Sequence, residues 1–175
     1  QEFETKLTNF HELYQWSCEF PESFWDLFWK YSSIIVERNP TETLKNGDDF
    51  LGSEWFPDAR LNFAKNLLTD SSDNPAIVFW AEDRQKSSLS HLELYRQVAR
   101  LSLWLKQKGV KKGDRVAGFL PNMPETVISM LATASLGAVW TSCSPDFGVQ
   151  GVLDRFGQVE PKVFICVDGY YYNGK

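Results

Sequence analysis

Residues 137–175 read GAVWTSCSPDFGVQGVLDRFGQVEPKVFICVDGYYYNGK, and this stretch decides the fold class. An apolar run at 138–141 predicts a buried strand, which opens into a loop of small polar residues at 142–146. A helix over 149–158 and a second strand over 162–167 follow. This order is how α/β proteins present ligand-contacting groups at the carboxyl ends of strands.

The same alternation extends back along the chain to residue 74. Apolar runs at 76–80 and 115–120 predict two more strands, and Leu89 is placed to pair back on the first of them. Helical patterns over 90–108 and 122–135 separate the strands, and a glycine follows the end of each. Strands that alternate with helices of ten or more residues predict an α/β fold, a parallel doubly wound sheet with helices on both faces.

The first seventy residues differ from the rest, because short helical patterns rich in aromatic residues are separated there by polar loops. Pro21 begins an apolar helix that continues to Tyr31, and a shorter helix is predicted over 61–68. We therefore expect a helical, aromatic-rich region over 1–70 and the α/β part over 71–175. The aromatic residues are expected to pack together, since basic residues for a base-stacking surface are not interleaved with them.

Composition narrows the classes of partner. The net charge is −5, which argues against a nucleic acid or an anionic membrane as partner, because either needs a clustered basic face. The three cysteines, Cys18, Cys143 and Cys166, are far apart and form no C-x-x-C, so we expect neither disulfides nor zinc, and a reducing cytoplasm. The uncharged stretch 126–145 is about as long as a membrane span, but Gly137 divides it into a predicted helix and a strand.

The familiar signatures of nucleotide and hydrolytic chemistry are missing from the sequence. Neither G-x-x-x-x-G-K-[ST] nor G-x-G-x-x-G occurs. The two histidines, His11 and His91, are expected at the surface, and no residues have metal-ligand spacing. We therefore predict no catalytic residue and no metal site in this sequence.

Over nearly its full length the chain resembles the N-terminal portion of the acyl-CoA synthetases of the adenylate-forming superfamily, and most closely those that activate acetoacetate. The residues that carry the resemblance form short motifs along the chain: Trp55-Phe56-Pro57, Arg60-Leu61-Asn62-Phe63-Ala64, Gly113-Asp114-Arg115-Val116-Ala117-Gly118, Leu120-Pro121-Asn122, Ser142-Cys143-Ser144-Pro145-Asp146-Phe147-Gly148, Val152-Leu153-Asp154-Arg155-Phe156, Glu160-Pro161-Lys162-Val163 and Val167-Asp168-Gly169-Tyr170. Acetyl-type relatives have Phe-Gly-Gly-Phe-Ser-Pro after the strand, and this difference favours acetoacetate as the substrate.

The resemblance implies a reaction. Such enzymes use ATP, with Mg²⁺, to turn acetoacetate into an acyl-adenylate and pyrophosphate, and then transfer the acyl group to coenzyme A with release of AMP. Residues 1–70 would be the helical N-terminal region of the acetyl-CoA synthetase type, and 71–175 the first part of the AMP-binding domain. The phosphate loop and the catalytic lysine lie further along in the family, so we expect an inactive fragment whose partners are acetoacetate, ATP, coenzyme A and the rest of its chain. The alternative is a self-standing α/β ligand-binding or protein-interaction module.

The resemblance also implies site residues at two places that would contact coenzyme A. The end of the strand would line the path of the thiol, and the terminal Gly-Lys loop would contact the phosphates, although Tyr172 stands where relatives have a basic residue. The residues are Thr141, Ser142, Cys143, Tyr172, Asn173, Gly174 and Lys175. Cys143 could alternatively be a nucleophile, but no histidine or basic residue adjoins it to lower its pKa, so a wall position is favoured.

Overall fold

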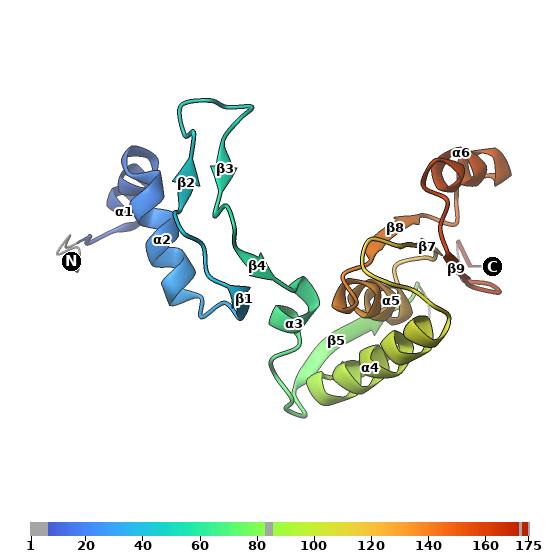
Figure 1. Cartoon of the computed structure of the whole chain (residues 1–175). Coiled ribbons are helices and arrows are strands. Elements are labelled where there is room, and N and C mark those ends of the chain that lie inside the picture. The colour runs from blue at the N-terminus through green and yellow to red at the C-terminus, as the bar shows by residue number, and fades with distance from the viewer. Residues whose placement is uncertain (1–6, 83–85, 172, 175) are drawn as a thin grey trace. The chain divides into compact units, whose positions relative to one another are not determined.

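A computed structural model describes residues 7–82, 86–171 and 173–174 of the chain (Figure 1). The chain divides into two compact units, residues 1–61 and 62–175. The first unit holds two helices and four short strands, and the second holds the remaining helices and the longer strands. We describe each unit by itself.

Two helices open the first unit, α1 (Phe10–Glu19) and α2 (Pro21–Tyr31). The side chain of Asn9 caps α1, and Pro21 occupies the first turn of α2 as its fixed backbone angle favours. Aromatic rings pack on one another here: the ring centroids of Trp16 and Phe24 are 5.9 Å apart. The prediction that the aromatic residues pack together is confirmed.

Four short strands complete the first unit, and the sequence analysis did not anticipate them. β1 (Val36–Arg38) pairs antiparallel with β4 (Arg60–Leu61), and β2 (Leu44–Lys45) pairs antiparallel with β3 (Glu54–Trp55). Elements of two or three residues are too short to show a period of two, so the pattern of apolar residues could not reveal them.

The second unit follows the predicted alternation of strands and helices. Its elements are α3 (Phe63–Leu67), β5 (Pro75–Trp80), β6 (Lys86–Ser90), α4 (His91–Gln107), β7 (Arg115–Phe119), α5 (Pro124–Ser135), β8 (Val139–Cys143), α6 (Val149–Val159) and β9 (Val163–Cys166). The α/β fold class is confirmed.

The strands of this unit form two sheets rather than one. β8, β7 and β9 make a parallel sheet in that order, so three of the four predicted strands share a sheet. The expectation that residues 76–80 join it is wrong: β5 pairs antiparallel with β6, and Ile77 lies opposite Leu89 as predicted. β6, the next strand along the chain, pairs with β5 over almost its whole length. A hairpin with β6 closes a much shorter loop than a pairing with β7 would, so it costs less conformational entropy.

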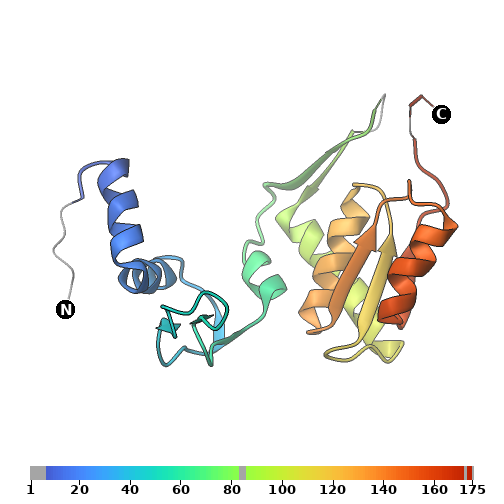
Figure 2. The same ribbon diagram turned by 90° about the horizontal axis from the view of Figure 1, so that it is seen from above.

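Helices cover both faces of the parallel sheet, as Figure 2 shows for α5 on one side and α6 on the other. Neighbouring residues of β7 point to opposite faces. Val116 belongs to the larger core with residues of α4 and α5, whereas Ala117 packs with Phe156 of α6. The helices on both faces of the sheet therefore pack against the central strand β7.

The uncharged stretch 126–145 is divided as the sequence predicted. α5 ends at Ser135, Gly137 has a positive φ of 68°, and β8 follows. α4 begins at the expected position, with a capping box formed by Ser90 and Glu93. Within the described residues we find no helix with the length and apolar character that crossing a bilayer requires.

Polar contacts tie together the edge of the sheet at which the strands begin. The carboxylate Oδ2 of Asp114 accepts hydrogen bonds from the backbone N–H of Lys111 at 2.7 Å and from Nζ of Lys162 at 3.0 Å. Arg115 donates from Nε to the carbonyl of Val159 at 2.7 Å. These contacts fix the end of α6 and the start of β9 against β7, leaving the opposite edge for the loops that follow the strands.

Candidate functional site

The carboxyl ends of the three parallel strands meet at one edge of the sheet. Phe119 of β7 lies opposite Cys143 of β8 and Cys166 of β9. The segments that leave this edge are 120–123, 144–148 and 167–171. In open α/β sheets this edge is where ligands bind, so it is the first place to look for a site.

At the end of β8 the structure extends the strand beyond its predicted limit. Ser142 and Cys143 were expected in a loop after residue 141, but they pair with β7 as the last residues of the strand. The strand continues because β7 itself runs on to Phe119 and supplies partners. Thr141 is half-buried and Ser142 is exposed, so Ser142 is the more accessible of the two side chains.

The side chain of Cys143 is only 8% exposed and packs with Ala117 and Phe156 beneath α6. Burial raises the pKa of this thiol, and the positive charge of Arg155 opposes the rise. A thiol with a raised pKa stays protonated near neutral pH and is a weak nucleophile. The geometry therefore supports the wall position for Cys143 over covalent catalysis.

A hydrogen bond joins the loops that follow β8 and β9. The hydroxyl of Tyr170 donates to Oδ1 of Asp146 at 3.1 Å, while the hydroxyl of Ser144 donates to Oδ2 of the same carboxylate at 2.7 Å. Because β8 and β9 lie on opposite sides of β7, this bond bridges the end of the central strand.

The terminal loop of the predicted site is described in part. Asn173 and Gly174 have positive φ angles of 50° and 74°, which define a tight turn. The backbone N–H of Gly174 donates to Oε2 of Glu82 at 3.2 Å, so the turn lies beside the end of the β5–β6 hairpin. Tyr172 and Lys175 lie outside the described residues. The neighbouring carboxylate was not anticipated, because Glu82 is about ninety residues away in the sequence.

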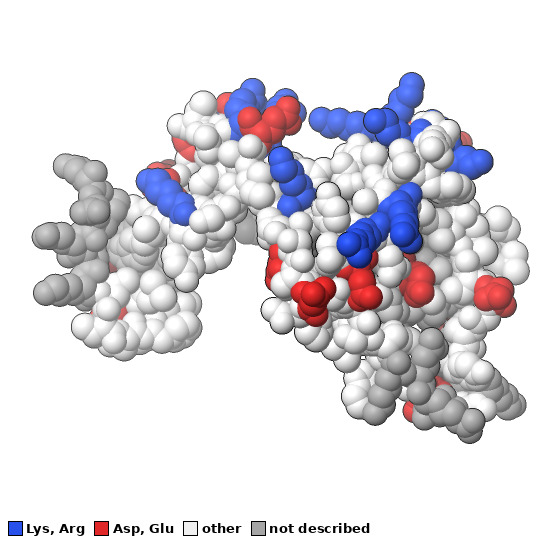
Figure 3. Space-filling model, turned by 90° about the horizontal axis from the view of Figure 1, so that it is seen from below, with Lys and Arg blue, Asp and Glu red and all other residues white. Residues whose placement is uncertain are grey.

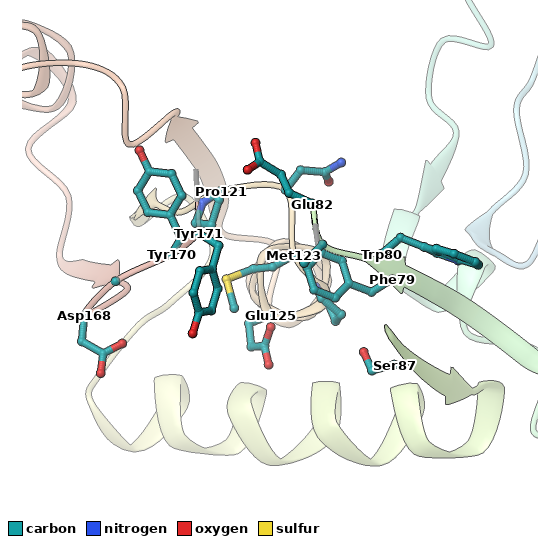
Figure 4. A pocket seen from close by; sticks show the side chains of 14 residues that line it. Phe79, Trp80, Glu82, Ser87, Pro121, Met123, Glu125, Asp168, Tyr170 and Tyr171 are labelled. Carbon is teal, nitrogen blue, oxygen red and sulfur yellow. The ribbon is translucent and has the colours of Figure 1, made fainter. Parts of the chain in front are cut away.

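A cavity of about 600 Å³ lies at this edge and combines aromatic walls with carboxylates (Figure 4). Three segments form it: the end of the hairpin, the segment between β7 and α5, and the segment after β9. Its lining residues include the apolar or aromatic Phe79, Met123, Tyr170 and Tyr171 and the carboxylates Glu82, Glu125 and Asp168. None of its described lining residues is basic, and Thr141, Ser142 and Cys143 do not line it.

The sequence analysis missed this cavity, although one signal was present. Leu120-Pro121-Asn122 belongs to a motif that follows a buried strand, which is the position where α/β proteins place binding groups. No such signal indicated that the hairpin lines the cavity, because the sequence pattern of Phe79 and Trp80 indicates only the end of a strand. In Figure 4 the two tyrosines stand on one side of Met123 and Phe79 on the other.

The described residues contain no group of three histidine, cysteine, aspartate or glutamate side chains that could hold a metal ion. His11 is exposed, Nε2 of half-buried His91 lies 3.5 Å from Oδ2 of Asp70, and neither histidine lines the cavity. The residues described at the carboxyl edge form walls and loops to which a ligand can bind.

Comparisons with known proteins identify the family to which this chain belongs. Residues 64–173 match the family described as AMP-binding enzyme, and residues 10–67 match the acetyl-coenzyme A synthetase N-terminus. The chain belongs to the AMP-binding enzyme family. This family match takes in the parallel sheet, the cavity and all of α4, α5 and α6.

Three relatives of this AMP-binding chain share its sequence over nearly its whole length. Acetoacetyl-coenzyme A synthetase of Rhizobium meliloti (strain 1021) is 47% identical over 175 residues, which is 100% of this chain and 27% of that protein. Acetoacetyl-CoA synthetase of Gallus gallus is 44% identical, over 97% of this chain and 26% of that protein. Malonamoyl-CoA synthetase vrtB of Penicillium aethiopicum is 34% identical, over 97% and 24%.

A solved structure extends the likeness to three dimensions. Acetoacetyl-CoA synthetase from Streptomyces lividans superposes with a TM-score of 0.89 at 40% identity, covering 98% of this chain and 27% of that one. The AMP-binding chain therefore spans about a quarter of the length of the relatives it matches.

Proposed function

We propose that this chain is part of an ATP-dependent acetoacetate–CoA ligase. The observation that carries the proposal is the likeness to acetoacetyl-CoA synthetases from bacteria and vertebrates at 40–47% identity over 97–100% of the chain. The malonamoyl-CoA synthetase is less similar, at 34% identity. Acetoacetate is therefore favoured as the acid that is activated.

The reaction has two steps. A carboxylate oxygen of acetoacetate attacks the α-phosphorus of ATP, and pyrophosphate leaves. The sulfur of coenzyme A then attacks the acyl carbon, its proton is released, and AMP leaves. The enzyme would contribute mainly by holding these charged reactants in line and shielding them from water.

The described residues do not fit ATP with its Mg²⁺. The cavity at the carboxyl edge is lined by three carboxylates and, among described residues, no cation, so triphosphate would be repelled there. Nor do the described residues contain a cluster that could hold a divalent ion. We assign no step of adenylation to them, and propose that parts of the enzyme beyond these 175 residues hold ATP and Mg²⁺.

The contribution we propose for this chain is to coenzyme A. Thr141, Ser142 and Cys143 would line the path of the thiol, mainly through backbone, since the Cys143 side chain is buried. Tyr172, Asn173, Gly174 and Lys175 would contact the phosphates. The glycine at 174 supports this role, because a residue without a side chain lets the backbone approach a ligand. The carboxylate of Glu82 opposes it, so the ammonium of Lys175 would be needed to offset that charge.

We further propose that residues 1–70 and 71–175 act as two parts of this enzyme, the first being its helical N-terminal region. Its partners would be acetoacetate, ATP, coenzyme A and the rest of its own chain, rather than nucleic acid. We place the enzyme in the cytoplasm, since Cys18, Cys143 and Cys166 are all free thiols.

The test measures the two half-reactions of the intact enzyme separately. Pyrophosphate release with ATP and Mg²⁺ should depend on acetoacetate, with acetate and malonamate much poorer substrates, and thioester formation should require coenzyme A. The 175-residue chain alone should release no pyrophosphate above the blank. A preference for another acid would contradict the proposal that acetoacetate is the substrate. Turnover by the 175-residue chain alone would contradict the proposal that adenylation needs other parts of the enzyme.

Lys175→Ala tests the coenzyme A contact. The KM for coenzyme A should rise about fivefold, which corresponds to about 1 kcal/mol for an exposed ionic contact. Acetoacetate-dependent adenylation should stay nearly unchanged. Lys65→Ala, at an exposed residue of α3, is the matched control and should alter neither half-reaction. An unchanged KM for coenzyme A in Lys175→Ala at low salt would contradict the proposed contact between Lys175 and the phosphates of coenzyme A.

A further inference from the structure

One face of the second unit carries an unusual concentration of positive charge. Six exposed basic residues lie on α4 and in the segment after it: Arg96, Arg100, Lys106, Lys108, Lys111 and Lys112. Residues 91–112 contain a single acid, Glu93, so six basic residues against one acidic residue give a formal charge of +5. The whole chain has a net charge of −5. The space-filling view of Figure 3 shows groups of basic side chains on this unit, bordered by acidic ones.

These six side chains form no ion pair with any described acidic residue. Lysines elsewhere in the described chain do find carboxylates: Nζ of Lys30 lies 2.7 Å from Oδ2 of Asp26, and Nζ of Lys45 lies 3.0 Å from Oε1 of Glu54. Among the described residues no ion pair therefore neutralises these six charges, and they remain available to an external anion.

Two large apolar side chains stand among these cations. Leu103 is 58% exposed and Trp104 is 43% exposed, although the opposite side of α4 is buried in the core. Lys108 places Nζ 5.6 Å from the centroid of the Trp104 ring. Arg100 precedes the pair by one turn of helix, so cations and apolar groups share the same outward face. We call Arg96, Arg100, Leu103 and Trp104 the α4 outer face; Lys106 and Lys108 flank it on opposite sides, and Lys111 and Lys112 follow the end of the helix.

The shape of this face selects its partner. It is the convex outward side of a helix of 17 residues, and Arg100, Leu103 and Trp104 line neither the cavity at the carboxyl edge nor the cavity of about 360 Å³ beside Lys65 and Tyr95. A convex surface fits a plane better than it fits an extended acidic peptide, which needs a groove. Basic residues around an exposed tryptophan and leucine are the combination that binds anionic lipid headgroups and reaches the boundary of the acyl chains.

We propose that the α4 outer face docks the protein on an anionic lipid surface. Glu93, in the first turn of the helix, confines the contact to the part from Arg96 onward. The net charge of the chain gave the opposite expectation because it sums over the whole surface. The basic cluster that an anionic membrane requires lies within residues 96–112, where the turns of α4 bring Arg96 and Arg100 beside Leu103 and Trp104.

Co-sedimentation with vesicles tests the proposal, using the protein in its longest natural form. Mixed phosphatidylcholine–phosphatidylserine vesicles are compared with pure phosphatidylcholine vesicles at low and at physiological salt. Binding should require phosphatidylserine and weaken as salt rises, because screening acts on exposed charges. The double variant Arg100→Gln/Lys106→Gln should bind the mixed vesicles about thirtyfold more weakly, as expected when two basic residues near such a surface are lost.

Two further variants separate the causes. Lys30→Gln/Lys45→Gln removes the same number of charges from paired lysines outside the α4 outer face and should bind like the unchanged protein. Leu103→Gln/Trp104→Gln keeps every charge and should weaken binding severalfold. Circular dichroism and the thermal midpoint check that each variant is folded.

Several outcomes would overturn the proposal. Absence of binding to the mixed vesicles, equal binding to pure phosphatidylcholine, or equal loss in the Lys30→Gln/Lys45→Gln control would each do so. Polyglutamate and duplex DNA serve as competing probes. Binding to either of them without binding to vesicles would show that the α4 outer face recognises an acidic polymer and not a lipid surface.

Discussion

At the residue scale, the end of β8 places one side chain in the core and the next at the surface of the sheet's carboxyl edge. Successive side chains of a strand point to opposite faces. Cys143 therefore packs under α6, while its neighbour Ser142 is exposed. Both residues lie at the carboxyl edge of the sheet, and their chemistry differs because their surroundings differ.

This difference in burial predicts that the thiol of Cys143 reacts slowly with thiol reagents. Burial raises its pKa and blocks access, whereas Cys18 and Cys166 are exposed. With a limiting thiol reagent at about pH 8, the two exposed cysteines should be labelled roughly tenfold faster or more. Peptide mass spectrometry over a time course measures the three rates. Equal rates would show that Cys143 is open to solvent and restore it as a candidate nucleophile.

The carboxylate of Asp114 predicts a pH dependence of stability. Its pKa lies below the ordinary value because it accepts a hydrogen bond from the backbone of Lys111 and a second from Lys162. A pKa lowered by folding means that the stabilisation is complete above the unfolded pKa of about 3.9 and is lost as pH falls through the folded pKa. Asp114→Asn should therefore lower the thermal midpoint near neutral pH and flatten its decline from about pH 5 to about pH 2.

The control for this prediction is Asp48→Asn, which changes an exposed aspartate of the first unit, outside the parallel sheet. Its thermal midpoint should follow that of the unchanged protein at every pH. Parallel profiles for Asp114→Asn and the unchanged protein would mean that the hydrogen bonds at the start of the sheet do not stabilise the fold.

At the element scale, the contact between β7 and β8 depends on a missing side chain. Gly118 is buried, and a methyl group added there would overlap the ring of Trp140. Gly118→Ala should lower the free energy of unfolding by about 1–3 kcal/mol, the usual cost of overpacking a core. Gly157→Ala, on α6 with open space around it, should instead raise it by about 0.5–1 kcal/mol.

Urea titration monitored by circular dichroism measures both changes. The double variant Gly118→Ala/Trp140→Leu should lose less than the sum of its single changes, because the smaller side chain relieves the overlap. Equal and small effects of the two glycine substitutions would show that the sheet adjusts around Trp140 at little cost.

The elements that the sequence predicted best were those with long periodic patterns and clear end signals. α4, α5 and α6 start and end within two residues of the expected positions, because a capping box, a proline and a glycine mark their ends. β5 was placed in the wrong sheet. Its apolar run shows that it is a strand, but the choice between β6 and β7 as partner depends on the hairpin and not on β5 itself.

At the scale of the whole molecule, burial is distributed unequally between the two units. None of the described residues in 7–61 is buried, whereas the second unit contains both core clusters. In the 175-residue chain, backbone amides of α1 and α2 should therefore exchange with deuterium much faster than those of α5 and β7, by roughly a hundredfold or more.

Hydrogen exchange followed by mass spectrometry measures this contrast. If residues 1–70 pack against the rest of a longer protein, as we propose, the amides of α1 and α2 should become protected in that protein. Equal protection of α1 and α5 in the 175-residue chain would show that the first unit is stable without a buried core.

The candidate site was predictable only in outline, and the reason is its non-local construction. The carboxyl edge followed from the order of strands and helices, although β8 continues through Ser142 and Cys143, beyond its predicted end. The cavity could not be predicted, since it joins the end of the hairpin to Tyr170 and Tyr171, which are some ninety residues away in the sequence. Periodicity describes each segment separately and says nothing about which segments meet.

The hydrogen bond between Tyr170 and Asp146 has a consequence for how this sequence can diverge. It joins two loops that a duplication or deletion would otherwise alter independently. A lineage that replaces Asp146 with an apolar residue removes this acceptor, so changes at positions 146 and 170 should be correlated. Changes in length within 144–148 should likewise be accompanied by changes within 167–171. The two loops are expected to evolve as one inherited unit, although a helix and a strand separate them in the gene.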